Sequence, residues 1–296
     1  MEKYKLFAGV YSDVGVSREI NQDNYYFGNN VPENSAVPRS ESLLYTDGGV
    51  FSVADGMGGE SQGEFASAAA MKEMQILDQN ENITKNDVIE AINHANSAIC
   101  ERMTLTKENI GTTIVTAVIK NNVVNIYNLG DSKCFLYDSS GKLIQLSKDH
   151  TLAAQMVHDN MMTPQQAQND PRKHQLTQHL GIYPEDMLLS VFCQNQFTLK
   201  KDEMLILCSD GLTDGLSNEK ITEILNRSKN GEYETLPKEL AAEAIAGGSK
   251  DNITVMVIRS LWDTDKSLKN IIFILACFCS AALGAIIALL LLGLGM

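Results

Sequence analysis

The stretch that most constrains the fold of this chain is residues 50–59, which read VFSVADGMGG. A short apolar run ends there on the carboxylate of Asp55, and three glycines follow within four residues. An apolar run bounded by glycines is typical of a buried strand. Gly56, directly after the aspartate, lets a ligand approach the backbone because glycine has no Cβ. The stretch therefore predicts a carboxylate held at the end of a rigid strand.

The same arrangement recurs at four other places in the chain. In each of them, an apolar or aromatic β-prone run begins or ends within a few residues of an aspartate. These aspartates are Asp23, Asp131, Asp210 and Asp251. A single Asp-Gly pair most often marks a turn. Five aspartates at strand ends also suggest one shared site, and spacing alone leaves the two interpretations evenly balanced.

If the five aspartates meet, the chemistry of the site follows from their side chains. The candidate ligands are oxygens, and no paired His or Cys spacing competes with them. Oxygen ligands favour Mg²⁺ or Mn²⁺ over zinc or copper. Asp55 would bridge two ions with the Gly56 carbonyl as a further ligand, and Asp210 and Asp251 would complete the pair. Such ions activate water for attack on phosphorus, and the planar guanidinium of Arg18 suits the phosphate oxygens.

Charge and cysteine content exclude several other classes of protein. The formal net charge of −13 argues against a nucleic-acid partner, because no basic block is present to neutralise phosphates. The six cysteines are scattered without zinc-site spacing. No secretory signal opens the chain, so reduced thiols in a cytosolic compartment are expected. The glycines after Asp55 lack a following Lys-Ser/Thr and do not form a nucleotide-phosphate loop.

Hydrophobic periodicity predicts more strands than helices, with the helices arriving in pairs. Thr84 and Asp87 are spaced as a capping box at the start of the second helix. Such a pattern predicts the α+β class, with antiparallel sheets packed together and helices outside. The expected strands lie within 4–28, before Asp55, as a four-stranded meander over 111–146, and at 188–199, 204–209 and 253–260. The expected helices are 61–79, 84–103, 151–168, 218–227 and 237–246, with polar loops at 29–41 and 171–179.

Residues 271–296 differ in kind from the rest, because they carry no charged side chain. As a helix they would span about 39 Å, enough to cross a hydrocarbon core of about 30 Å. A buried core helix is the alternative. Trp262 is placed like an interfacial anchor, and Lys266 and Lys269 precede the span, so the positive-inside rule places residues 1–265 in the cytoplasm. We therefore expect a single-pass C-terminal anchor in the lipid bilayer of the cell membrane. Small residues four apart leave helix pairing open: Ala276, Ser280, Gly284 and Ala288.

Six ordered motifs resemble those of metal-dependent protein phosphatases of the type 2C class. They are SREINQD (17–23), VADGMGG (53–59), GTT (111–113), NLGDS (128–132), SDGL (209–212) and DNIT (251–254). The resemblance runs from about residue 5 to 259 and is closest to the bacterial branch, whose members often oppose membrane serine/threonine kinases. It implies a phosphatase catalytic domain at 1–261, and the uncharged C-terminal run adds a juxtamembrane linker at 262–270 and a transmembrane helix at 271–296.

The resemblance also implies a fold and a role for each site residue. The fold would be a four-layer α/β/β/α sandwich of two antiparallel sheets flanked by helix pairs, with the metals at one edge. The cofactors would be two Mn²⁺ or Mg²⁺ ions, with a third, weaker one in bacterial members. Residues 151–180 fall where the family has a mobile flap. Matched residue by residue, Asp55 resembles the bridging metal ligand, Gly56 resembles the carbonyl ligand, and Asp210 and Asp251 resemble the other direct ligands of the metal pair. Asp23 resembles the acid that holds a metal-bound water, and Asp131, with Asp210, resembles the ligands of the third ion. Arg18 resembles the phosphate-binding arginine.

Three positions depart from the family pattern. Met57 stands where animal members have a histidine, the proposed general acid for the leaving alkoxide, and a thioether cannot donate a proton. We therefore assign no general acid. Gln22 replaces a glutamate common in the family, which weakens a water-mediated metal contact. Lys133 replaces the usual arginine at a position expected to be structural. Residues 29–47 are longer and more polar than in compact bacterial members.

The sequence thus predicts a membrane-tethered hydrolase of phosphoserine and phosphothreonine that opposes a membrane serine/threonine kinase. Its partners would be phosphoproteins, including that kinase or its substrates. One alternative is an inactive membrane scaffold that binds phosphoproteins, although the metal aspartates and Arg18 are all present. Another is an aspartyl-phosphate enzyme with Asp210 as nucleophile, which Leu212 disfavours because that class has a second aspartate there. The five histidines, at 94, 150, 158, 174 and 179, are expected on the surface or the flap.

Overall fold

The computed structural model describes residues 3–29, 31–32, 38–45, 48–58, 62–228 and 233–263. The transmembrane helix expected at 271–296, and the expected linker from residue 264 onward, lie outside the described residues. Within the described part of the chain, no helix combines the length and apolar character needed to cross a membrane.

Two antiparallel sheets form the centre of the molecule. The first has the strand order β10-β9-β13-β14-β1-β3, and the second has the order β11-β8-β7-β4-β2 with β12 also beside β8. The strands of the first sheet are β1 (Lys3–Asp13), β3 (Arg39–Tyr45), β9 (Lys133–Tyr137), β10 (Leu143–Gln145), β13 (Met204–Cys208) and β14 (Ile253–Asp263). Those of the second are β2 (Asn24–Tyr26), β4 (Gly48–Ala54), β7 (Ile114–Lys120), β8 (Val123–Leu129), β11 (Phe192–Cys193) and β12 (Phe197–Thr198). A small ribbon pairs β5 (Gly56–Met57) with β6 (Gly111–Thr112).

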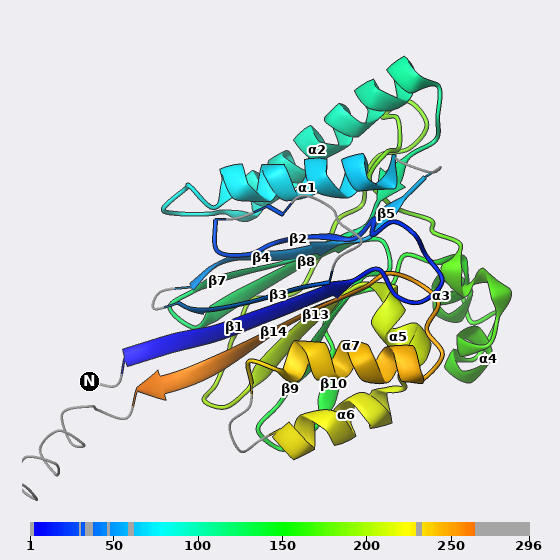
Figure 1. Cartoon of the computed structure of the whole chain (residues 1–296). Coiled ribbons are helices and arrows are strands. Elements are labelled where there is room, and N and C mark those ends of the chain that lie inside the picture. Colours follow the sequence, from blue (N-terminus) through cyan, green and yellow to red (C-terminus); the bar gives the residue numbers. More distant parts are fainter. Residues whose placement is uncertain are drawn as a thin grey trace, which may run out of the picture.

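Helices cover the outer face of each sheet, as Figure 1 shows. The pair α1 (Gly63–Leu77) and α2 (Lys85–Thr106) packs on the second sheet. The first sheet is covered by α5 (Asp210–Gly215), α6 (Asn218–Arg227) and α7 (Leu236–Ala246). The short helices α3 (Leu152–His158) and α4 (Pro164–Gln168) and the 3-10 turn η1 (Pro171–His174) project at one end (Figure 1). The predicted four-layer α/β/β/α sandwich is therefore confirmed.

The apolar residues form three layers, one between the sheets and one under each group of helices. Strand β4 contributes to two of them, because Phe51 and Val53 face the other sheet whereas Val50 and Ala54 face α1 and α2. A strand buried on both faces reads as a continuous apolar run rather than as an alternating one. This explains why the sequence marks β4 so strongly.

One local prediction is confirmed in detail, and one turn has the geometry typical of a β-hairpin. Thr84 caps α2 through a capping box with Asp87. Asn121 and Asn122, both with positive φ, form the two-residue turn between β7 and β8, as the right-handed twist of hairpin strands favours.

The predicted four-stranded meander over 111–146 is wrong. Strands β7 and β8 pair in the second sheet, whereas β9 and β10 belong to the first. The turn at Gly130-Asp131 therefore carries the chain from one sheet to the other. The amphipathic pattern could not reveal this crossing, because both sheets bury the same kinds of side chain. The crossing matters because it places Asp131 at the edge where the two sheets meet.

Three further elements differ from the expectations. Strand β3 lies in the polar stretch interpreted as part of a loop region, where it pairs with β1. The helical segment 151–168 is two helices, because the chain turns at Asn160 (φ 58°) and Thr163 caps α4. The short helix α5 begins at Asp210, directly after β13.

Candidate metal centre

Five aspartates converge at the end of the sandwich, where strands of both sheets begin or end. The carboxylate of Asp55 lies close to the other four carboxylates. Burial is the largest cause that raises the pKa of Asp55 well above its usual value, and the charges of these four neighbours raise it further. These four are Asp23, Asp210, Asp131 and Asp251. All five therefore meet, which resolves the choice between isolated turns and one shared site in favour of the site.

The backbone of Asp55 is fixed by the Gly-Thr-Thr motif that contains β6. The Asp55 N–H donates to Thr113 Oγ1 at 3.0 Å, and the Thr113 N–H donates to the Asp55 carbonyl at 2.9 Å. The Thr112 hydroxyl donates to that same carbonyl at 2.9 Å. Thr113 Oγ1 also lies 2.6 Å from Ser132 Oγ, beside Asp131. Two threonines thus tie the aspartate that follows β4 to the turn that follows β8.

Gly56 occupies a position where only glycine fits. A Cβ atom there would lie 2.2 Å from the Gly63 carbonyl oxygen and 2.6 Å from that of Gln22. The Gly56 N–H donates to the Gln22 carbonyl at 3.2 Å. This close approach sets the direction of the backbone directly after Asp55, as a carbonyl ligand at Gly56 requires.

Asp23 lies deepest in the cluster, with 3% of its surface exposed. The Ser209 hydroxyl donates to Asp23 Oδ2 at 2.7 Å and accepts the Thr254 N–H at 3.0 Å. Burial raises the pKa of Asp23 to about 7, and the charges of Asp251 and Asp210 act in the same direction. Ser209 thereby connects the carboxylate to the ends of β13 and β14.

The pKa values of Asp131 and Asp210 are shifted in opposite directions. Burial, with the charge of Asp210, raises the pKa of Asp131 to about 7. Burial acts on Asp210 in the same direction, but His174 and Lys133 outweigh it and leave its pKa below the usual value. Without a metal, Asp210 therefore stays ionised more readily than Asp131.

Arg18 stands at the rim of the cluster. Its Nη2 atom donates to Asp251 Oδ2 at 2.8 Å, and its side chain is 54% exposed. Nearby, Asn252 accepts the Gln22 N–H and donates to the Val14 and Ile20 carbonyls, which holds the loop that carries Arg18. An exposed guanidinium beside buried carboxylates is suitably placed for an anionic substrate.

The donor set fits hard divalent cations. The Oδ1 atom of Asp210 is buried and has no hydrogen-bond partner among the described residues. Several buried carboxylates that raise one another's pKa form a site whose charge a cation would compensate. The residues at this centre that the sequence predicted are all present at one place: Arg18, Asp23, Asp55, Gly56, Asp131, Asp210 and Asp251.

Residues 43–242 match the family model of protein phosphatase 2C. The chain belongs to this family. It is 30% identical over 224 residues to the serine/threonine protein phosphatase PstP of Mycobacterium tuberculosis, covering 74% of this chain and 41% of PstP. The chain thus matches about two fifths of the length of PstP. It is also 30% identical over 219 residues to the serine/threonine phosphatase Stp of Listeria welshimeri, covering 70% of this chain and 82% of Stp.

A solved structure supports the fold. The crystal structure of the PstP catalytic domain in complex with two manganese ions superposes with a TM-score of 0.71 at 27% identity. It covers 87% of this chain and 99% of that one. The expected family and its fold are therefore confirmed.

One histidine of this phosphatase 2C chain was assigned wrongly. His150 is neither on the surface nor on the flap, because only 9% of it is exposed and its Nδ1 accepts the Gly130 N–H at 3.1 Å. Burial lowers its pKa, so the neutral ring serves as the acceptor. No sequence pattern signals this contact, since the partner is a backbone group 20 residues away.

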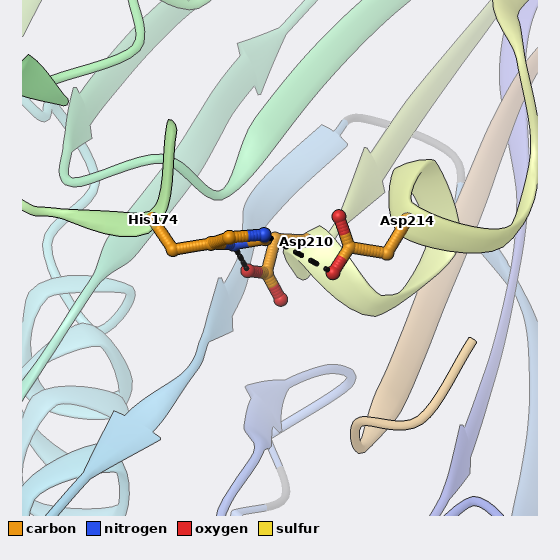
Figure 2. Close-up of side chains that lie close together, drawn as sticks. All are labelled: His174, Asp210 and Asp214. Atoms are coloured by element: carbon orange, nitrogen blue, oxygen red, sulfur yellow. Dashed lines mark ion pairs between the residues drawn. The ribbon is translucent and has the colours of Figure 1, made fainter. Parts of the chain in front are cut away.

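The supporting residues of the metal centre were also missed. Thr113, Ser132 and Ser209 lie inside the quoted motifs, but only the aspartates and the arginine of those motifs were given roles. Lys133, expected to be structural, donates to the Asp131 carbonyl at 3.0 Å and pairs with Asp149 at 3.0 Å. His174 lies on the flap as expected, but its ring is next to Asp210 (Figure 2).

Proposed function

We propose that the chain is a metal-dependent protein phosphatase, a hydrolase that removes phosphate from phosphoserine and phosphothreonine in proteins. The observation that carries the proposal is the convergence of five aspartates beside one exposed arginine. The family match and the serine/threonine phosphatases among its relatives support it. An inactive scaffold would be expected to have lost one of these residues.

Asp55, the Gly56 carbonyl, Asp210 and Asp251 would hold two Mn²⁺ or Mg²⁺ ions. Asp131, with Asp210, would hold a third and weaker one. When bound, such ions lower the pKa of water and polarise phosphoryl oxygens. The two manganese ions in the PstP catalytic domain support this assignment.

The chain's own groups have separate tasks in this reaction. Arg18 would bind the phosphate oxygens with its planar guanidinium, and its contact with Asp251 holds that group at the rim. Asp23, held by Ser209, would accept a hydrogen bond from water at the centre and so orient it. Met57 has no proton to donate to the leaving alkoxide.

We also propose that residues 271–296 anchor this domain in the cell membrane as a single span, with residues 1–265 in the cytoplasm. The support is the uncharged run of 26 residues with Lys266 and Lys269 before it. A phosphatase tethered in this way would oppose a membrane serine/threonine kinase, acting on the kinase or on its substrates.

Phosphate release from a phosphothreonine peptide tests the enzymatic part. The detergent-solubilised full chain should turn over with manganese, and chelator should abolish turnover. Binding of the peptide without any release would instead favour the scaffold. Membrane fractionation of cells expressing the chain with and without residues 271–296 tests the anchor, and equal partition of both would contradict it.

A further inference from the structure

The ribbon of β5 and β6 lies beside the metal centre, because β5 begins directly after Asp55. Across this ribbon Met57 lies opposite Gly111. On its other side β6 is bridged to the end of the flap. The Leu180 N–H donates to the Thr112 carbonyl at 2.8 Å, and the Thr112 N–H donates to the Leu180 carbonyl at 3.1 Å. The end of the flap and β5 therefore flank β6 on its two sides.

The absence of a side chain at Gly111 makes room for the imidazole of His179. A Cβ atom at Gly111 would lie 2.8 Å from His179 Nδ1 and 2.6 Å from the Leu180 carbonyl oxygen. The ring therefore lies over the face of β6 toward which a side chain at position 111 would point. Positions directly opposite in an antiparallel pair project to the same face, about 5 Å apart. The imidazole thus shares a face of the ribbon with Met57.

The half-buried His179 ring has one nitrogen fixed and the other available. Its Nδ1 atom lies 2.8 Å from the Leu180 carbonyl oxygen. Because a carbonyl oxygen only accepts, Nδ1 carries a hydrogen in this contact. Among the residues that the structure describes, Nε2 has no hydrogen-bond partner. A histidine held at one nitrogen by a carbonyl presents the other nitrogen in a defined direction.

The proposed reaction needs a group that protonates the leaving oxygen of the substrate, because an alkoxide leaves poorly without a proton. Arg18 does not give up protons in proteins. His150 is the neutral acceptor of a backbone N–H. The contact of His174 with Asp210 raises the pKa of that histidine, so its ring is a weaker acid. Within the described part of the chain, His179 has no carboxylate partner of this kind.

We propose that His179 is a catalytic residue, the general acid that protonates the leaving oxygen of phosphothreonine or phosphoserine. The inference rests on the proposed phosphatase function and deepens it. The oxygen of water forms a bond to phosphorus as the bond from phosphorus to the substrate Oγ breaks. The imidazolium Nε2–H gives its proton to that Oγ, which leaves as the alcohol. The attacking water releases one proton to solvent, and the ring regains a proton from solvent.

Dependence on the leaving group tests this role. The full chain is compared with His179→Asn, because the asparagine amide can still donate to the Leu180 carbonyl while Nε2 is lost. The substrates are a phosphothreonine peptide and p-nitrophenyl phosphate, whose weakly basic p-nitrophenolate leaves without a proton. We expect kcat for the peptide to fall at least about 100-fold and kcat for p-nitrophenyl phosphate to change little.

Two further proteins control for structure. His158→Asn replaces a histidine elsewhere on the flap whose side chain is 75% exposed, and should keep its turnover of both substrates. Mn²⁺ binding, measured by equilibrium dialysis, should be the same in this variant, in His179→Asn and in the full chain. Adding Met57→His to His179→Asn returns an imidazole to the same face of the ribbon. It should restore part of the peptide turnover, which a merely structural role of His179 would not allow.

Three results would overturn the role of His179. They are an undiminished peptide kcat in His179→Asn, an equal loss of kcat on both substrates, and the same substrate-dependent loss in His174→Asn instead. If His179→Asn does not fold, His179→Gln takes its place, because its amide near the Nε2 position still has no proton to transfer. A full chain that turns over neither substrate would refute the proposed function and this role with it. Turnover by the full chain without the substrate-dependent loss would refute the role alone.

Discussion

The hydroxyl of Thr113 accepts a hydrogen bond from the backbone N–H of Asp55 at 3.0 Å. The same oxygen lies 2.6 Å from Ser132 Oγ, so one threonine side chain joins two of the segments that carry metal-centre aspartates. The position of Asp55 is therefore set by the neighbouring strand as much as by its own.

Replacing Thr113 with valine keeps the volume and removes the acceptor for the Asp55 N–H. Because supporting contacts of this kind typically govern metal affinity by about 10–100-fold, we expect Mn²⁺ binding to weaken by that factor. Thr116→Val is the matched control, since Thr116 is buried on β7 and bonds Ser52 away from the centre. It should lower stability by about 1 kcal/mol with unchanged metal affinity. Equal metal affinity in the two variants would contradict the role of Thr113.

Ser209→Ala removes the hydroxyl that donates to Asp23 Oδ2. A hydrogen bond to the charged form lowers the pKa of a carboxyl, so its loss should raise the pKa of Asp23 further above about 7. A titration of the Asp23 carboxyl in the metal-free protein, followed by nuclear magnetic resonance in chelator, should show this increase in pKa. Ser52→Ala, a buried serine outside the centre, should leave the titration of Asp23 in place. An unchanged titration in Ser209→Ala would refute this assignment.

The metal-free protein should lose stability as pH rises from about 4 to about 7. Asp23 and Asp131 have folded-state pKa values of about 7, against 3.8 for an unperturbed aspartate, so the folded chain holds protons there that the unfolded chain has released. The lowered pKa of Asp210 acts only below this range. Urea unfolding in chelator should show the decline, and Asp23→Asn should reduce its slope. A rise in stability over this range, or an unchanged slope in the variant, would count against the buried-carboxylate account.

Arg18→Lys keeps the charge but loses the planar pair of donors. We expect KM for a phosphothreonine peptide to rise and kcat/KM to fall by about 100-fold. Stability should hardly change, because the pair with Asp251 is partly exposed. Arg172→Lys is the control, since Arg172 pairs with Asp170 on the flap, away from the aspartate cluster. Similar kinetics for both variants would show that Arg18 does not bind the phosphate.

Much of this site could be predicted from the sequence, because each aspartate lies beside an apolar run or a glycine that leaves a local signal. Asp55 and Asp210 both follow continuous apolar strands. The crossing of the chain between sheets at Asp131 left no such signal, since both sheets bury similar residues. Contacts between residues far apart in the sequence were also missed, because they leave no local pattern in it. His150 binds the backbone of Gly130, and His174 reaches Asp210 only because the flap folds back. Strand β3 was missed because its pairing with β1 outweighs its polar composition.

The most direct test of the central claim is phosphate release by the full chain and by Asp55→Asn at saturating manganese. Asp78→Asn is the control, because Asp78 is a partly buried carboxylate that accepts bonds from Tyr26 and Val50 outside the centre. We predict metal-dependent turnover in the full chain and in Asp78→Asn, with a loss of at least about 100-fold in Asp55→Asn. Undiminished turnover in a folded Asp55→Asn protein would contradict the claim that the converging aspartates form the catalytic centre.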